Sequence, residues 1–115
     1  MSTGTNLNYT FGVPPGNTLL LTIQVVDFSG NILLNTSLSS IQLNIYAPGS
    51  IPTSPNAIPL ATIIPTAFSG SYWSTYYTVP LYATIGTYIV QIEALTISSF
   101  QLTDYSKFRT IPIDW

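Results

Sequence analysis

The sequence has neither cysteine nor histidine, and it holds very little charge. Without cysteine it can form no disulfide and supply no thiolate, and without histidine it lacks the commonest general base and a common metal ligand. Charged side chains make up 5% of the 115 residues, whereas about a quarter is typical of globular domains. These absences predict a protein that is not an enzyme and that binds no metal or cofactor.

The small number of charges also limits the partners. Two cationic side chains cannot form the basic track that binds nucleic-acid phosphates or an anionic membrane surface. No apolar run approaches the roughly 18 residues that span a bilayer, so no membrane insertion is expected. Four acidic side chains and no histidine leave few protons to be taken up on unfolding. We therefore expect an acid-stable fold, whose stability barely changes from about pH 7 to about pH 2.

The few charged residues point to no specific chemistry. The four acids are too widely spaced for a calcium loop, which needs several close oxygen ligands. Asp27 opens residues 27–30, where a turn is favoured over a proteolytic role because serine and glycine follow it. Lys107 is better interpreted as a solvent-facing lysine than as the donor of an intramolecular isopeptide bond.

Alternation of apolar and polar residues with a period of two recurs along the chain and predicts strands. Pro59 and Pro65 confine one of these strands to a sheet edge, because proline cannot donate to a ladder hydrogen bond. Short strands between Gly- and Pro-containing turns predict an all-β antiparallel sandwich, with residues 1–115 as a single domain. The expected strands cover residues 8–13, 18–27, 41–46, 58–64, 71–79, 87–94, 100–103 and 108–113.

Three short motifs follow one another within residues 18–94. They are a strand and turn at 21–31, a G-x-Y segment at 69–72 with a Val-Pro-Leu end at 79–81, and a G-T-Y strand within 83–94. In this order they resemble the immunoglobulin-like modules of prokaryotic and archaeal surface proteins, of the macroglobulin-type or bacterial immunoglobulin-like group. The resemblance implies an immunoglobulin-like antiparallel β-sandwich of about seven strands. With its low charge, the chain is also similar to exported or virion proteins of thermoacidophilic archaea.

The resemblance also implies roles for individual residues. Tyr88 takes the position of a corner tyrosine, whose hydroxyl bonds back to the chain. Ile23 and Val90 take the central core positions that antibody domains join by a disulfide. No residue matches the core tryptophan of antibody domains, which favours the broader group of surface modules.

The aromatic segment at 72–77 is the most informative local feature. In a strand, Tyr72 and Tyr76 lie on one face, and Trp73 and Tyr77 lie on the other. The resemblance places Tyr72 inside, so Trp73 and Tyr77, with Tyr82 beyond them, form the predicted interaction surface. Exposed rings in a row stack on sugars or anchor a protein interface. The alternative is that these rings pack beneath a neighbouring loop or the C-terminal segment.

Two further features bear on the surface. Asn8 and Asn35 begin N-x-S/T sequons and are possible glycosylation sites, although a chain so rich in Ser and Thr contains such sequons by chance. Leu20, Val26 and Ile89 are apolar at outward strand positions, which indicates that something covers a sheet face.

The function expected is therefore a non-catalytic structural or assembly module of an extracellular, cell-surface, filament or virion protein. Its partners would be other protein subunits or neighbouring domains, including further copies of itself in a homo-oligomer. The alternative is a carbohydrate-binding or adhesion module, in which the exposed aromatic strand binds a glycan.

Overall fold

A computed structural model describes residues 2–7, 13–27 and 29–112, with side chains from residue 13 onward. These residues form nine strands and one 3-10 turn, and among them no helix has the length and apolar character needed to cross a bilayer. The elements are β1 (Ser2–Leu7), β2 (Thr18–Val26), β3 (Ile32–Leu33), η1 (Asn35–Ser37), β4 (Leu38–Tyr46), β5 (Ala61–Ile63), β6 (Ala67–Ser69), β7 (Tyr72–Thr78), β8 (Gly86–Thr96) and β9 (Gln101–Thr110).

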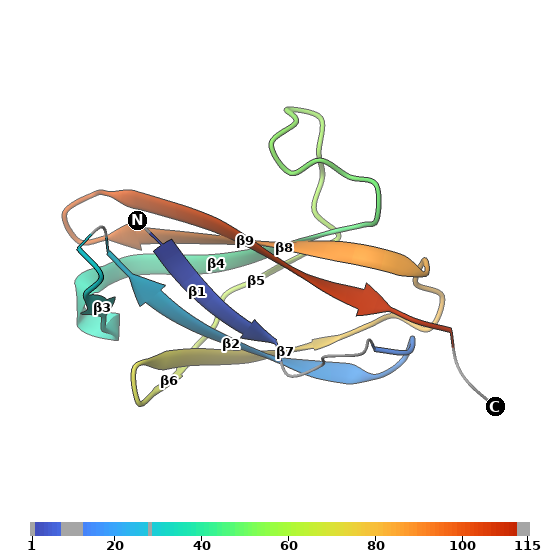
Figure 1. The fold of residues 1–115 in the computed structure, drawn as a ribbon, viewed down its shortest axis with the longest axis horizontal. Coiled ribbons are helices and arrows are strands. Elements are labelled where there is room, and N and C mark those ends of the chain that lie inside the picture. Colours follow the sequence, from blue (N-terminus) through green and yellow to red (C-terminus); the bar gives the residue numbers. More distant parts are fainter. Residues whose placement is uncertain (1, 8–12, 28, 113–115) are drawn as a thin grey trace.

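The strands form two antiparallel sheets that lie face to face (Figure 1). One sheet has the order β1-β2-β7-β6, with β3 also paired to β2, and the other has the order β5-β4-β8-β9. These orders correspond to the ABED and CFG sheets of an immunoglobulin constant-type sandwich, with β5 added beside the C position. The predicted all-β sandwich is confirmed, with nine described strands instead of about seven.

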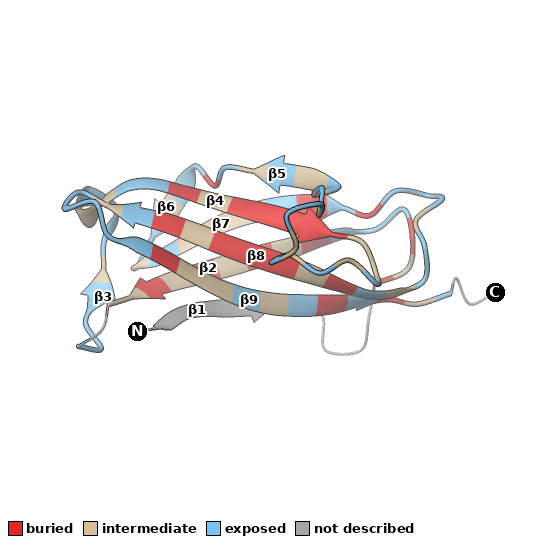
Figure 2. Ribbon diagram, turned by 90° about the horizontal axis from the view of Figure 1, so that it is seen from above, coloured by how far each residue is buried: buried red, intermediate tan, exposed pale blue. Residues whose placement is uncertain are grey.

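The core lies between the sheets and follows the predicted alternation. Every second side chain of β2 and β8 is buried, and the buried positions form red stripes along the strands in Figure 2. Ile23 and Val90, the two predicted central positions, are fully buried. Each buried side chain of this size stabilises the fold by about 1.5–3 kcal/mol relative to exposure, so these stripes supply the main driving force.

Proline sets one side of the sandwich. The strand predicted at 58–64 is β5, an edge strand of three residues that begins after Pro59 and ends before Pro65. Beyond Pro65 the chain crosses to the other sheet and forms β6 at the edge of that sheet. The short β6 was not predicted, because three residues are too few to show a period.

The opposite side is formed by the N-terminal region and β9. Residues 8–12 of the strand predicted at 8–13 lie outside the described residues, but Val13 forms a parallel bridge to Thr110. In this bridge the Val13 N–H donates to the Arg109 carbonyl at 2.8 Å, and the Ile111 N–H donates to the Val13 carbonyl at 3.2 Å. Strand β1 was not predicted, because its Ser, Thr, Gly and Asn residues show no apolar alternation.

The last strand is longer than predicted. The segments expected at 100–103 and 108–113 are joined in one strand, β9, which pairs with β8 without a break from Gly86–Thr110 to Leu95–Gln101. Residues 104–107 hid this continuity. The positions in step with the buried Leu102 and Phe108 hold Asp104 and Ser106, which are polar and only partly buried, so the apolar alternation is interrupted there. Pairing with β8 therefore decides the extent of β9, since local composition favours a break there.

Candidate interaction surfaces

Charge is distributed very unevenly between the two sheets. The strands β1, β2, β3, β6 and β7 contain no charged residue at all. The charged residues that the structure describes lie on the other sheet, at Glu93, Asp104, Lys107 and Arg109, or in a turn, at Asp27. One whole face of the sandwich is therefore uncharged.

The outward side chains of β2 and β7 cover the centre of this uncharged sheet. We call them the tyrosine face, and they are Leu20, Thr22, Gln24, Tyr72, Ser74 and Tyr76. Leu20 lies opposite Tyr76 and Thr22 lies opposite Ser74 in the register of the two strands. At the margins the Thr18 and Thr78 hydroxyls are 2.7 Å apart, and the Gln24 amide donates to the Ser71 hydroxyl at 3.1 Å. The face thus combines aromatic, aliphatic and hydroxyl groups.

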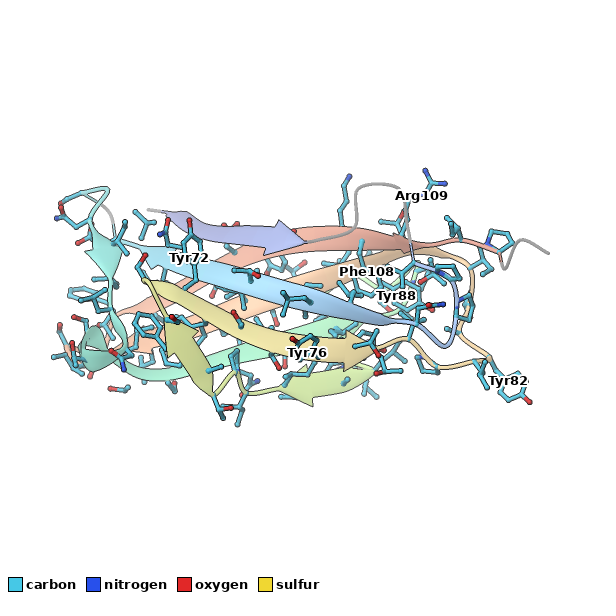
Figure 3. The ribbon with its side chains drawn as sticks, turned by 90° about the horizontal axis from the view of Figure 1, so that it is seen from below. Tyr72, Tyr76, Tyr82, Tyr88, Phe108 and Arg109 are labelled. Carbon is cyan, nitrogen blue, oxygen red and sulfur yellow. The ribbon has the colours of Figure 1, made fainter. Side chains whose placement is uncertain are left out.

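Two tyrosine rings stand out on this face, which is turned toward the reader in Figure 3. Tyr72 is 39% exposed and Tyr76 is 69% exposed. The two residues are four positions apart on one side of a strand, which places their Cα atoms roughly 13 Å from each other. Exposed rings on a flat sheet present apolar area together with a polar hydroxyl, as protein and sugar interfaces require.

The prediction that Trp73 and Tyr77 form the exposed pair is wrong. Tyr77 belongs to the core, and Trp73 packs against the core with its ring 5.0 Å from that of Phe68. The reason lies in the pairing of β7 with its two neighbours. The turn before β7, where Gly70 and Ser71 both have positive φ, as a two-residue type I′ hairpin requires, pairs Trp73 with Phe68 on β6. The register with β2 places Trp73 opposite the buried Ile23, so its ring faces inward.

Tyr88 lies at the start of β8 and faces the core. Its hydroxyl donates to the carbonyl of Thr84, four residues upstream, at 2.6 Å. This is the type of bond that defines a corner tyrosine. The Tyr88 ring stacks on Phe108 with centroids 5.1 Å apart, so this residue is structural. Burial raises the pKa of its phenol above the ordinary value of 10.0.

The outer face of the second sheet carries a row of amides that was not predicted. The Thr62 hydroxyl donates to Asn44 Oδ1 at 3.0 Å, Asn44 Nδ2 donates to Gln91 Oε1 at 2.9 Å, and Gln91 Nε2 donates to the Tyr105 hydroxyl at 3.3 Å. The four residues are register neighbours across β5, β4, β8 and β9. Gln91 stands at an outward position of the alternation in β8 but is buried, and these bonds satisfy its amide.

The remaining predicted residues are spread over the molecule. Tyr82 lies in the loop between β7 and β8 and is 97% exposed, so it is separate from the two rings of the tyrosine face. Asn35 is exposed in η1, and its glycosylation stays a prediction. Asn8 lies outside the described residues. Ile89 is on the other sheet from Leu20 and Val26, and with Pro52 and Tyr105 it lines a hollow of about 560 Å³ beneath the loop that joins β4 and β5.

No family model matches the sequence, and no curated protein matches it either. Among solved structures, the chain is similar to the PmoD soluble domain from Methylocystis sp. (Rockwell), with a TM-score of 0.62 and 15% identity over 95% of this chain and 90% of that one. A family 123 glycoside hydrolase from Clostridium perfringens also aligns, with a TM-score of 0.37 and 11% identity over 97% of this chain and 28% of that one. The likeness to the PmoD domain concerns the fold alone. Fold and surface together define a β-sandwich module with one uncharged face.

Proposed function

We propose that this domain is a non-catalytic assembly module of an extracellular surface, filament or virion protein. In this proposal its tyrosine face is covered by another protein subunit, in the simplest case by a second copy of the chain. The observation that carries the proposal is the absence of charge from the whole β1-β2-β7-β6 sheet. The likeness to a soluble domain of similar length fits a module of this type.

The low cost of desolvation favours the tyrosine face as the core of an interface. Covering a charged group costs several kcal/mol unless a partner compensates it, and the cores of protein interfaces are accordingly poor in charge and rich in tyrosine. The tyrosine face has no charge to compensate, and its hydroxyl and amide groups can pair with a partner. Two copies that meet through the same face form an isologous pair, in which Tyr76 and Leu20 of each copy lie near the centre.

Placing a charge at the centre of the tyrosine face tests this assignment. The change Tyr76→Arg is expected to weaken self-association at least about thirtyfold, the loss that corresponds to ~2 kcal/mol at an interface hot spot. Sedimentation velocity over a range of concentrations measures the effect. The matched control is Tyr105→Arg, which makes the same change at a half-exposed tyrosine on the other sheet and should leave the association constant unchanged. Equal effects of the two changes would place the interface elsewhere.

A carbohydrate-binding module is the second candidate, and the exposed Tyr72–Tyr76 pair is the observation that favours it. Two exposed rings on one side of a strand, with Cα atoms roughly 13 Å apart, are suited to stacking on sugar units of one extended chain. If this function is correct, Tyr72→Ala and Tyr76→Ala each abolish retention on insoluble polysaccharides while the chain stays monomeric. Retention that survives both changes, or no retention by the unchanged protein on any polysaccharide tested, would exclude this candidate and favour assembly.

A further inference from the structure

The two ends of the molecule differ in shape and are both apolar. The described residues form an elongated body of 48 × 33 × 20 Å. At one end the loop between β7 and β8 presents Leu81 and Tyr82, which are 67% and 97% exposed. We call these two residues the tip, and Figure 3 shows Tyr82 projecting from this end. These two adjacent apolar side chains are available to a partner surface, which would remove them from water.

The opposite end is hollowed. A cavity of about 360 Å³ opens between the β2–β3 turn, η1 and the β8–β9 turn. We call it the end cavity, and its apolar lining consists of Leu33, Ile97, Phe100 and Leu102. Polar groups surround this lining, and they belong to Asp27, Ser29, Ser37, Thr96 and Ser98. The volume is at the lower end of the range for sites that bury small ligands, and it is large enough for an aromatic side chain.

Hydrogen bonds hold the walls of the end cavity in place. The Ile97 N–H donates to the Ser37 carbonyl at 3.1 Å and links the β8–β9 turn to η1. Within the turn, the Phe100 N–H donates to the Thr96 hydroxyl at 3.0 Å, and the Ser99 N–H donates to the Thr96 carbonyl at 2.9 Å. The cavity is therefore formed in the isolated chain, so a partner that enters it pays little ordering cost.

Among the residues that the structure describes, the charges at the two ends are of opposite sign. Asp27 stands at the rim of the end cavity, and the Asn31 and Ser29 N–H groups donate to its Oδ1, each at 2.9 Å. Arg109 is exposed at the tip end, where it lies opposite Thr87 at the start of β8 (Figure 3). Glu93 and Asp104 also lie nearer the cavity end of their strands, whereas Lys107 lies nearer the tip end. Copies that stack in the same direction bring unlike charges together.

We propose that the tip of one copy docks into the end cavity of a second copy, so that the domains stack head to tail along their long axis. Both halves of the contact belong to this chain and lie at opposite ends, which makes a second copy the fitting occupant. Such a contact is heterologous and produces rings or open filaments instead of closed dimers. It is separate from the tyrosine face, and the two contacts together would join filaments side by side.

The size of the ends sets the strength of this contact. The 33 × 20 Å cross-section limits an end contact to roughly 500 Å² per partner, which is less than the ~800 Å² of a standard stable interface. Head-to-tail stacking is therefore weak between free domains. It becomes effective when copies are concentrated or when a second contact holds them together. A test must consequently capture the docked pair and cannot depend on a stable oligomer.

Because the chain has no native cysteine, single cysteines report which ends meet. We choose Thr84→Cys beside the tip and Ser98→Cys at the rim of the end cavity, since both residues are exposed. The two variants are mixed at equal, high concentration and joined with a short thiol-reactive cross-linker, which avoids the strict geometry of a disulfide. Intact-mass measurement then gives the ratio of mixed dimers to the two like dimers, relative to random pairing.

Mixed dimers are expected in more than about fivefold excess over random pairing, since a millimolar contact already populates the docked pair at millimolar protein. Adding Tyr82→Ser to the Thr84→Cys chain should return the ratio to random. A random ratio from the start, or an excess that Tyr82→Ser does not remove, would overturn the proposal. Repeating the mixture with Tyr76→Arg in both chains separates the two interfaces, because the excess must persist when the tyrosine face is disabled.

Discussion

Phe108→Ala is expected to lower the free energy of unfolding by about 3–5 kcal/mol, the usual cost of removing a buried phenylalanine side chain. Phe108 is 4% exposed and lies between two tyrosines, stacked on Tyr88 at 5.1 Å and tilted against Tyr77 at 6.0 Å. Tyr77 belongs to the opposite sheet, so this cluster of rings holds the two sheets together. Urea denaturation of the variant and the unchanged chain measures the difference.

Phe100→Ala is the matched control, because it removes the same side chain at a position that is 63% exposed. Its effect on the stability of the single chain should stay within roughly 0.5 kcal/mol. A loss below about 1 kcal/mol for Phe108→Ala, or equal losses for the two variants, would contradict the packing described between the sheets.

Loss of stability at alkaline pH is the second large effect expected. Burial raises the pKa of Tyr46, Tyr77 and Tyr88 above the ordinary 10.0, because the phenolate form is disfavoured away from water. In the unfolded chain these phenols ionise near pH 10, whereas in the folded chain they stay neutral to higher pH. The stability they provide is therefore complete below about pH 10 and is lost as the pH rises toward the folded-state pKa values.

In that range each of the three tyrosines lowers the free energy of unfolding by up to about 1.4 kcal/mol per pH unit. Their combined effect is therefore a steep loss of stability. Urea denaturation at a series of pH values between about 8 and 12 measures it. Tyr77→Phe should reduce the slope by the equivalent of one proton. A stability that stays flat to about pH 12 would show that these phenols are not buried in solution.

The acid side of the same profile should be nearly flat. Hydrogen bonds from the Asn31 backbone, and secondarily from Ser29, hold the pKa of Asp27 below its ordinary 3.8. A lowered folded-state pKa gives stability that is present above the unfolded value and is lost as the pH falls through the folded one. Asp27 therefore adds a small loss of stability that is confined to the region below about pH 4. Above that region the profile stays flat, because the chain has few acids.

Much of the fold could be predicted from the sequence, because the core strands alternate clearly. The alternation along β2 and β8 separates the buried side chains from the outward ones, with the exception of Gln91, which is also buried. The alternation assigns this polar side chain to the outer face of β8. Only the alignment of β4, β8 and β9 brings Asn44 and Tyr105 within hydrogen-bonding distance of its amide. Hydrogen bonds across three strands have no local signature, so a buried amide row cannot be recognised before the pairing is known.

The candidate site was harder to predict, and the reason is register. Residues 72–77 place aromatic rings on both faces of a strand, so the sequence permits either face to be buried. A one-residue slip exchanges the two faces, and the pairing of β7 with both β6 and β2 sets the register that exposes Tyr72 and Tyr76. The resemblance placed Tyr72 inside and so favoured Trp73 and Tyr77 as the exposed pair, whereas the strand pairing that decides between the two faces has no local signature in the sequence.

Copies of this domain are proposed to assemble with one another through the tyrosine face. The most direct test is the molar mass of the unchanged chain, measured by light scattering after size exclusion over roughly a hundredfold concentration range near pH 3 and near pH 7. The expected result is a mass above that of a single chain that grows with concentration at both pH values. The mass of a single chain at every concentration and both pH values would contradict it.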